Sequence, residues 1–253
     1  MKKIKKYTAL ALAALLLLAS LTLLSSCGGT VRYDDADYKT GGLISDSETV
    51  KAIEIVWQSG EVKVEGVLTD KLFVMEDRLP GDDLALRYRL KDGVLSIYPC
   101  ASGENAARLE KKLIVQIPYA MANALERVTV TTDSADVECS LLTTAALTVT
   151  TDSGDVSYMG GAKDATVTTV SGELDMQASG VDALCFTSVS GDADVAIQTA
   201  GFKAVMNGGS GEINFDGPIS VHQSANIYSY GDQKSTLVFT TKSGEVELSL
   251  WKS

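Results

Sequence analysis

The chain has 253 residues and a formal net charge of −11, with 45% hydrophobic, 6% aromatic and 22% charged residues. This length is enough for one domain with a substantial core. Because so acidic a chain repels phosphate backbones and anionic headgroups, we expect no nucleic-acid partner and favour cations, basic proteins or neutral glycans.

Residues 1–26 have the layout of a secretory signal. Four lysines among the first six residues precede an apolar run over 9–24, which is short for a membrane-spanning helix. The run ends Leu24-Ser25-Ser26-Cys27, which resembles the cleavage box of bacterial lipoproteins. The resemblance implies that Cys27 becomes the first mature residue and carries a thioether-linked diacylglycerol. The alternative is a signal-peptide cysteine that is cut away.

A lipidated Cys27 predicts anchoring at the extracytoplasmic face of a bacterial cell membrane. One acyl chain holds a protein to a bilayer only marginally, whereas two or more hold it stably. The small, polar residues that follow, with little periodicity, predict a flexible tether over 27–49. We expect one β-strand-repeat domain over 50–253.

One short pattern recurs in that domain: apolar positions, Ser, Gly or Ala, an acid, then more apolar positions. The tripeptide occurs seven times, at residues 59–61, 134–136, 153–155, 171–173, 190–192, 210–212 and 243–245. Apolar residues alternate with polar ones on both sides of it, which is the period of a β-strand. The apolar positions nearest the serine on its two sides are an odd number of residues apart. In one straight strand they would face opposite sides, so the chain must bend between them, and Gly permits the bend.

The repeat predicts an all-β fold, a β-solenoid of short strands with about 19 residues per unit, each unit being one coil stacked on the last. An array of antiparallel hairpins would place the same residues on one side and stays open as an alternative. Four threonine pairs in equivalent places favour stacking. Less regular strands are expected at Leu72–Glu76, Leu84–Leu90, Val94–Tyr98 and Leu113–Ile117.

Part of this region resembles a known family. The element Ile114–Pro118, the run Leu125 to Val130 and the recurring Ser-Gly-acid bends are similar to the "putative-adhesin" family of bacterial β-strand-repeat domains. The resemblance covers roughly 50–253. It implies a repetitive all-β surface domain and carries over no catalytic residue.

The acid two residues after each serine is the first candidate site. Stacking would place these acids in a column of like charges, which needs compensation. They could accept hydrogen bonds from N–H groups at the bends, or bind a divalent cation such as Ca²⁺. No other cofactor is expected. The acids are Glu61, Asp136, Asp155, Glu173, Asp192, Glu212 and Glu245.

Aromatic residues offer a second candidate, a sugar-stacking surface formed by Trp57, Tyr228 and Tyr230. Leu248, Leu250 and Trp251 are expected to plug the last coil or to dock a partner. The disulfide state of three cysteines stays open, although Cys139 and Cys185 fit buried apolar positions. These three are Cys100, Cys139 and Cys185.

These features favour a lipid-anchored, surface-exposed binding or scaffold module of the envelope, adhesin-like and non-catalytic, with an unknown glycan or envelope protein as partner. One alternative is an envelope-sensing accessory lipoprotein that binds a membrane protein. A polysaccharide-acting β-helix enzyme is the other. Glycoside hydrolysis needs one distinguished pair of carboxylates, whereas here acids recur in every unit, so we expect no enzyme.

Overall fold

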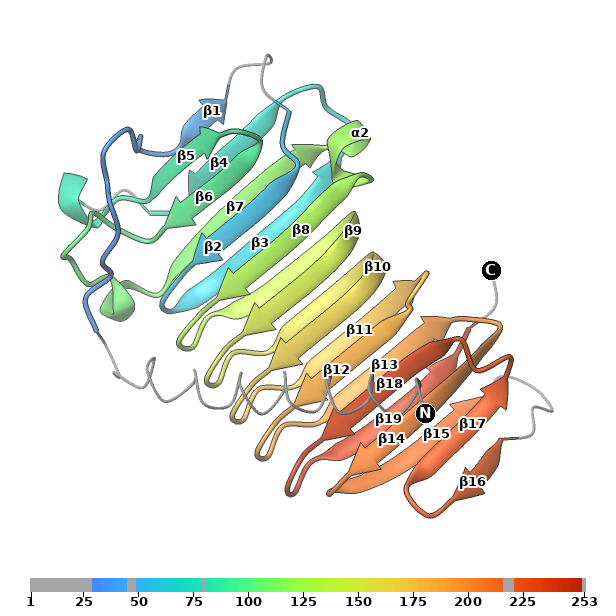
Figure 1. Cartoon of the computed structure of the whole chain (residues 1–253). Helices are drawn as coiled ribbons and strands as arrows, with labels where there is room; N and C mark the ends of the chain where they lie inside the picture. Colours follow the sequence, from blue (N-terminus) through green and yellow to red (C-terminus); the bar gives the residue numbers. More distant parts are fainter. Residues whose placement is uncertain (1–28, 45–48, 79–80, 216–220, 252–253) are drawn as a thin grey trace.

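The computed structural model describes residues 29–44, 49–78, 81–215 and 221–251, so Cys27 lies outside the described residues. Over these residues the chain forms strands joined into one continuous winding sheet, with short helical turns (Figure 1). None of the described helices combines the length and apolar character needed to cross a membrane. The prediction of an all-β, solenoid-like repeat fold is confirmed.

Each coil consists of one strand before a bend and one strand after it. We call the wall of strands before the bends face I. Neighbours in face I are parallel and in register, and the apolar side chains of every strand point to the same side. In stacking order, face I contains β6 (Val94–Tyr98), β2 (Ala52–Val56), β8 (Leu125–Thr131), residues 144–150 of β9 (Asp136–Thr150), residues 164–168 of β10 (Val156–Thr168), β12 (Ala183–Thr187), β18 (Ser235–Thr240) and β14 (Gly201–Asn207).

We call the wall of strands after the bends face II. It is parallel as well, and the core lies between the two faces, where Ile53, Phe186 and Phe239 are fully buried. In stacking order, face II contains β7 (Lys111–Pro118), β3 (Gly60–Val67), residues 136–140 of β9, residues 156–161 of β10, β11 (Leu174–Ser179), β13 (Ala193–Gln198), β19 (Glu245–Leu250) and β15 (Ser210–Phe215).

The coils do not all stack in sequence order. The first coil of the repeat, β2 and β3, lies between the β6–β7 coil and the β8–β9 coil. The last coil, β18 and β19, lies between the β12–β13 coil and the β14–β15 coil. The expectation that each coil stacks on the preceding one therefore holds only from β8 to β13.

This exchange of order is physically possible because every coil offers the same edge of backbone N–H and C=O groups. Exchanging two neighbouring coils leaves the number of paired edges unchanged, so backbone pairing alone does not fix their order. Leu248 is fully buried and Leu250 nearly so, between β13 and β15. The two leucines therefore belong to the core, and the expectation that they plug the end of the stack is wrong.

Antiparallel strands pair instead with the outermost strands of both faces at the N-terminal end and of face I at the other end. At the N-terminal end, β4 (Leu72–Glu76) pairs with β7, and β5 (Arg87–Lys91) pairs with β6. β1 (Gly42–Ile44) adds to β4, and η1 (Asp82–Leu84) precedes β5. At the other end β17 (Ile227–Gly231) pairs with β14, and β16 (His222–Ser224) follows. These strands protect edges that would otherwise pair with other chains.

Most of the irregular strands lie where the sequence predicts them. β4 and β6 have the expected bounds, and β7 includes the expected Leu113–Ile117. The strand expected from Leu84 begins only at Arg87, because Leu84 ends the 3-10 turn η1. The described residues contain two further helical turns, η2 (Ala107–Leu109) and α2 (Tyr119–Ala122).

Glycine is required at the bends because neighbouring coils approach closely there. A Cβ on Gly172 would lie within 3.0 Å of the carbonyl oxygen of Gly154, and one on Gly191 would lie equally close to that of Gly172. The φ angles of these glycines are not positive. The bends at Gly172 and Gly191 therefore select Gly for the space between coils and not for a left-handed backbone.

A column of buried hydroxyl groups closes four of the bends from inside. Thr151 accepts a hydrogen bond from the N–H of Gly154, and Thr169 accepts one from the N–H of Gly172. Ser188 and Thr241 make the same bond in their own coils. These hydroxyls are buried, so each needs such a partner. The second threonine of each repeated pair thus serves the bend, while the first lies on the outer side of face I.

Part of the segment expected to be a tether packs on the N-terminal end of the stack. The N–H of Val31 donates to the carbonyl of Glu104, and the Tyr33 hydroxyl donates to the carbonyl of Cys100. The Tyr33 ring stacks on Tyr98 with ring centroids 3.8 Å apart. Tyrosines that bury their rings and satisfy their hydroxyls hold residues 31–38 against β6.

Candidate functional site

The repeated acids form a column along the outer edge of face II. Glu61 lies opposite Asp136, and the acids of the next coils follow in the same register. Their side chains are exposed or half-buried. The column has six members within the described residues, Glu61, Asp136, Asp155, Glu173, Asp192 and Glu245.

Backbone N–H groups compensate the charges along the middle of this column. Asp136 accepts a hydrogen bond from the N–H of Asp155 at 3.0 Å, and Asp155 accepts one from the N–H of Glu173 at 2.9 Å. Asp192 accepts the N–H of Glu245 at 2.6 Å. Each aspartate thus caps the bend of the neighbouring coil, which a short carboxylate side chain can reach.

Lysines compensate the acids at the N-terminal end of face II. Lys112 forms an ion pair with Glu61 at 2.6 Å, and Lys63 forms one with Glu138 at 3.2 Å. Further along the stack a second column of acids runs parallel to the first. There burial and the nearby carboxylates of Glu247 and Asp175 raise the pKa of Asp194. Face II therefore presents an acidic surface that repels anions.

Glu212 does not join the column expected for it. The register places Glu212 opposite Glu247, while Ser210 stands opposite Glu245. Only Gly208 and Gly209 separate β14 from β15, and both have positive φ angles. This bend is shorter than the others, so its acid shifts along the strand by two positions.

Within the described residues, no group of three or more His, Cys, Asp or Glu is arranged to hold a metal ion. The geometry explains this, because the Asp136, Asp155 and Asp192 carboxylates point along the stack toward N–H groups instead of converging. Ca²⁺ needs several oxygen ligands around one point. A straight column of single carboxylates does not supply such a shell.

The three aromatic residues expected to form one surface lie apart. Trp57 is only 1% exposed, and its Nε1 donates to the carbonyl of Lys111, so its ring offers no face to a ligand. Tyr228 and Tyr230 lie on β17 and pack against the core, with Tyr230 5.9 Å from Phe202 between ring centroids. They cover the C-terminal end of the stack, far along the chain from Trp57.

The three cysteines of the described part are free thiols. Cys100 and Cys139 are buried, and burial raises the pKa of the Cys139 thiol to about 12, so neither is poised for nucleophilic chemistry. Cys185 is half-buried on the outer side of face I, in register with Thr166 and Val238. It therefore differs from the buried position expected for it, because Leu184 and Phe186 take the inward positions of β12.

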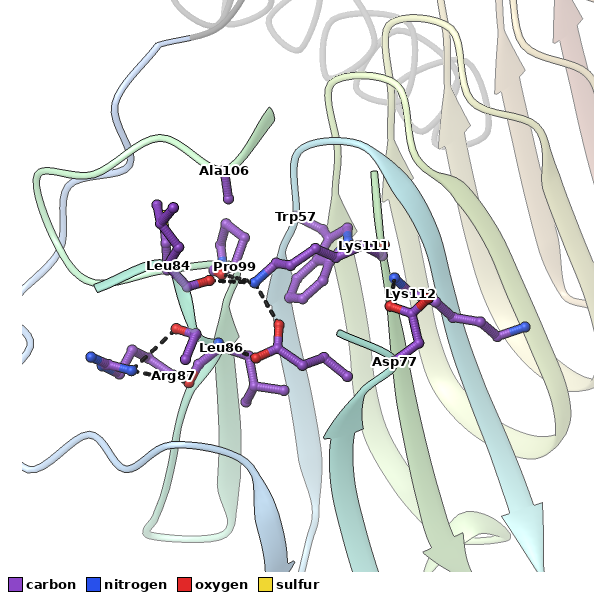
Figure 2. A network of polar contacts seen from close by, with 12 residues as sticks. Trp57, Asp77, Leu84, Leu86, Arg87, Pro99, Ala106, Lys111 and Lys112 are labelled. Carbon is purple, nitrogen blue, oxygen red and sulfur yellow. Dashed lines mark hydrogen bonds and ion pairs between the residues drawn. The ribbon is translucent and has the colours of Figure 1, made fainter. Parts of the chain in front are cut away.

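A buried charge that the sequence reading missed holds the N-terminal end together (Figure 2). The Lys111 side chain is 1% exposed, and its Nζ lies 2.6 Å from the Glu76 carboxylate. It also donates to the carbonyls of Leu84 and Pro99 and lies over the Trp57 ring. Lys111 is an even number of residues from Leu113, Val115 and Ile117, so all four side chains lie on the same side of β7. This spacing was the sequence signal that the Lys111 side chain points inward.

The repeated bends, the parallel pairing of neighbouring coils and the antiparallel strands at the ends together define a solenoid-like repeat protein with two different faces. The chain belongs to the Toastrack DUF4097 family, whose pattern matches residues 30–252. No curated protein is detectably similar to it.

Proteins similar to this chain are also found among solved structures. The chain is similar to a "putative cell adhesion protein" from Clostridium sporogenes, with 13% identity over 85% of this chain and 100% of that one and a TM-score of 0.46. It is also similar to a "putative adhesin" from Bacteroides fragilis, with 14% identity over 83% and 97% of the two chains and a TM-score of 0.41. The family match confirms that the chain carries a repeat domain of the kind that its sequence resembles.

Proposed function

We propose that the chain is an adhesin-like binding or scaffold module of the bacterial envelope. Lipid on Cys27 holds it at the extracytoplasmic face of the cell membrane. It acts by contact through the surface of the stack, with a glycan or an envelope protein as partner, and it catalyses no reaction.

The observation that supports this proposal is the equivalence of the acids. One carboxylate oxygen of each of three aspartates accepts a hydrogen bond from a backbone N–H at the bend of a neighbouring coil. These are Asp136, Asp155 and Asp192. Carboxylate catalysis needs two acids in unlike environments, one of them with a raised pKa, at a defined separation. Aspartates that repeat the same task in several coils are suited to building a long, regular surface.

The packed N-terminal segment also supports a fixed orientation on the membrane. Val31 is hydrogen-bonded to Glu104 and follows Cys27 by four positions in the sequence. Covalent geometry limits that span to about 14 Å. A lipid on Cys27 would therefore keep the β5–β6 end of the stack next to the bilayer.

Replacing Cys27 by Ser (Cys27→Ser) tests the anchor. We expect the variant to lose incorporation of an alkyne-labelled fatty acid and to leave the membrane fraction, since no thioether can form. The matched control is Ser26→Ala, which keeps the cysteine and the small residue before it. Retention of label by Cys27→Ser would contradict the proposed anchor.

Binding is tested with the chain lacking residues 1–26 and carrying Cys27→Ser. We expect saturable binding to a neutral glycan on an array or to one protein of isolated envelopes, with no turnover of either. Failure to bind any glycan or any envelope fraction would overturn the binding proposal. Turnover of a polysaccharide that one carboxylate-to-amide change abolishes would favour the enzyme alternative.

A further inference from the structure

A shallow groove of about 330 Å³ lies at the edge opposite the Ser-Gly-acid bends. It crosses several coils and includes Tyr119 of α2, Leu141 of β9, Met159 of β10, Gln177 of β11 and Trp251 after β19. Figure 1 shows α2 on the same edge as the corners of β9 and β10. The groove is elongated along the stack, because its lining residues come from several coils and parallel strands are spaced by about 4.8 Å.

Exposed apolar side chains gather in this groove. Tyr119 is 47% exposed, Leu141 54% and Met159 47%, and these are half of the six large exposed hydrophobic residues of the described part. Burying such side chains normally stabilises a fold by about 1.5–3 kcal/mol each, so leaving three together at one place forgoes that gain. Contiguous exposed apolar surface of this kind marks interaction sites.

The backbone pushes Leu141 out. Its φ angle is 55°, in the left-handed region that bulky side chains rarely adopt. The register between β9 and β10 shifts here, because Met159 pairs with Ser140 and Gly160 with Leu142, which leaves Leu141 without a partner in the ladder. A strained bulge that exposes a leucine does not help folding, and such strain concentrates at functional positions.

The groove also contains polar groups that have no hydrogen-bond partner among the described residues. The Trp251 Nε1 is shielded from solvent and has no hydrogen-bond partner in the described part of the chain. The Gln177 side chain makes no hydrogen bond to described residues, and Asn123 uses its Oδ1 for Thr143, which leaves the Asn123 amide N–H groups. None of the described residues that line the groove is charged, in a chain of net charge −11.

We propose that this groove binds a neutral oligosaccharide. Tyr119 and Trp251 supply ring faces for the apolar C–H faces of sugar rings, and the amides of Asn123 and Gln177 bond to hydroxyls. The absence of lining charge matches an uncharged ligand. A peptide added as a strand is disfavoured, because the backbones of β9, β10 and β11 are already paired on both sides.

The site assignment rests on the proposed binding function, and its test separates the two. Wild type and variants of the unlipidated chain are compared on a glycan array and by calorimetry with the best neutral oligosaccharide. We expect Tyr119→Ala and Trp251→Ala each to weaken binding about tenfold or more, and Tyr119→Phe to retain it. Leu68→Ala, at a 94% exposed leucine outside the groove, serves as the matched control.

Melting temperatures establish whether each variant is folded. Tyr119 is 47% exposed, so its replacement should leave the core intact. Glycan binding that survives Tyr119→Ala and Trp251→Ala would overturn the groove and leave the proposed function intact. If both variants lose a protein partner while no glycan binds the wild type, the sugar assignment is overturned. Absence of any ligand removes the proposed function and the groove assignment with it.

Discussion

Replacing Lys111 by Met (Lys111→Met) is expected to lower the free energy of unfolding by about 3–5 kcal/mol. The change leaves the Glu76 carboxylate, which is 7% exposed, without its cation. It also removes the donor to the carbonyls of Leu84 and Pro99 (Figure 2). Denaturant unfolding followed by circular dichroism measures the effect.

The expected loss comes from an unpaired charge more than from a lost attraction. Burial lowers the pKa of Lys111, and the bond to Glu76 opposes this shift without overcoming it. The pair therefore recovers less than the desolvation of the ammonium group costs. Adding Glu76→Gln to Lys111→Met should restore part of the stability, because Gln removes the charge and can still accept the N–H of Leu86.

Lys112→Met is the matched control for this experiment. Lys112 is the next residue, but its side chain is 35% exposed and pairs with Glu61 at the surface. Surface pairs contribute about 0–1 kcal/mol, so the control should unfold nearly like the wild type. If the two methionine variants were equally stable, Lys111 would have no special role in holding the N-terminal end.

Replacing Gly191 by Ala (Gly191→Ala) is expected to destabilise the stack by roughly 1–3 kcal/mol or more. The new Cβ would lie within 3.0 Å of both the Gly172 carbonyl oxygen and the Ser188 hydroxyl. Both belong to bends held in place by hydrogen bonds, so neither can move without separating two coils. The melting temperature should fall accordingly.

Gly81→Ala provides the contrast. Gly81 has a φ of −55°, and a Cβ there would meet no atom within 4 Å. Alanine should therefore be neutral or slightly stabilising, through the lower entropy of the unfolded chain. A Gly191→Ala variant as stable as Gly81→Ala would show that the spacing between the coils is looser than the structure describes.

The sequence by itself determined the strands, the bends and the repeat, because these follow from local patterns. Alternation of apolar residues places Leu237, Phe239 and Val246 inward, and the Ser-Gly-acid tripeptide marks the bends. The lipid site at Cys27 is also a purely local signal, and it stays a prediction. All of these depend on residues close together in the chain.

Only the tertiary structure decided the order of the coils and the surroundings of Trp57, Lys111 and Trp251. Every coil presents the same edge of backbone groups, so no residue in β2 or β19 specifies which coil becomes its neighbour. The groove of Tyr119, Leu141 and Trp251 joins segments more than a hundred residues apart. Such contacts depend on which coils become neighbours, and a local pattern carries no information about that choice.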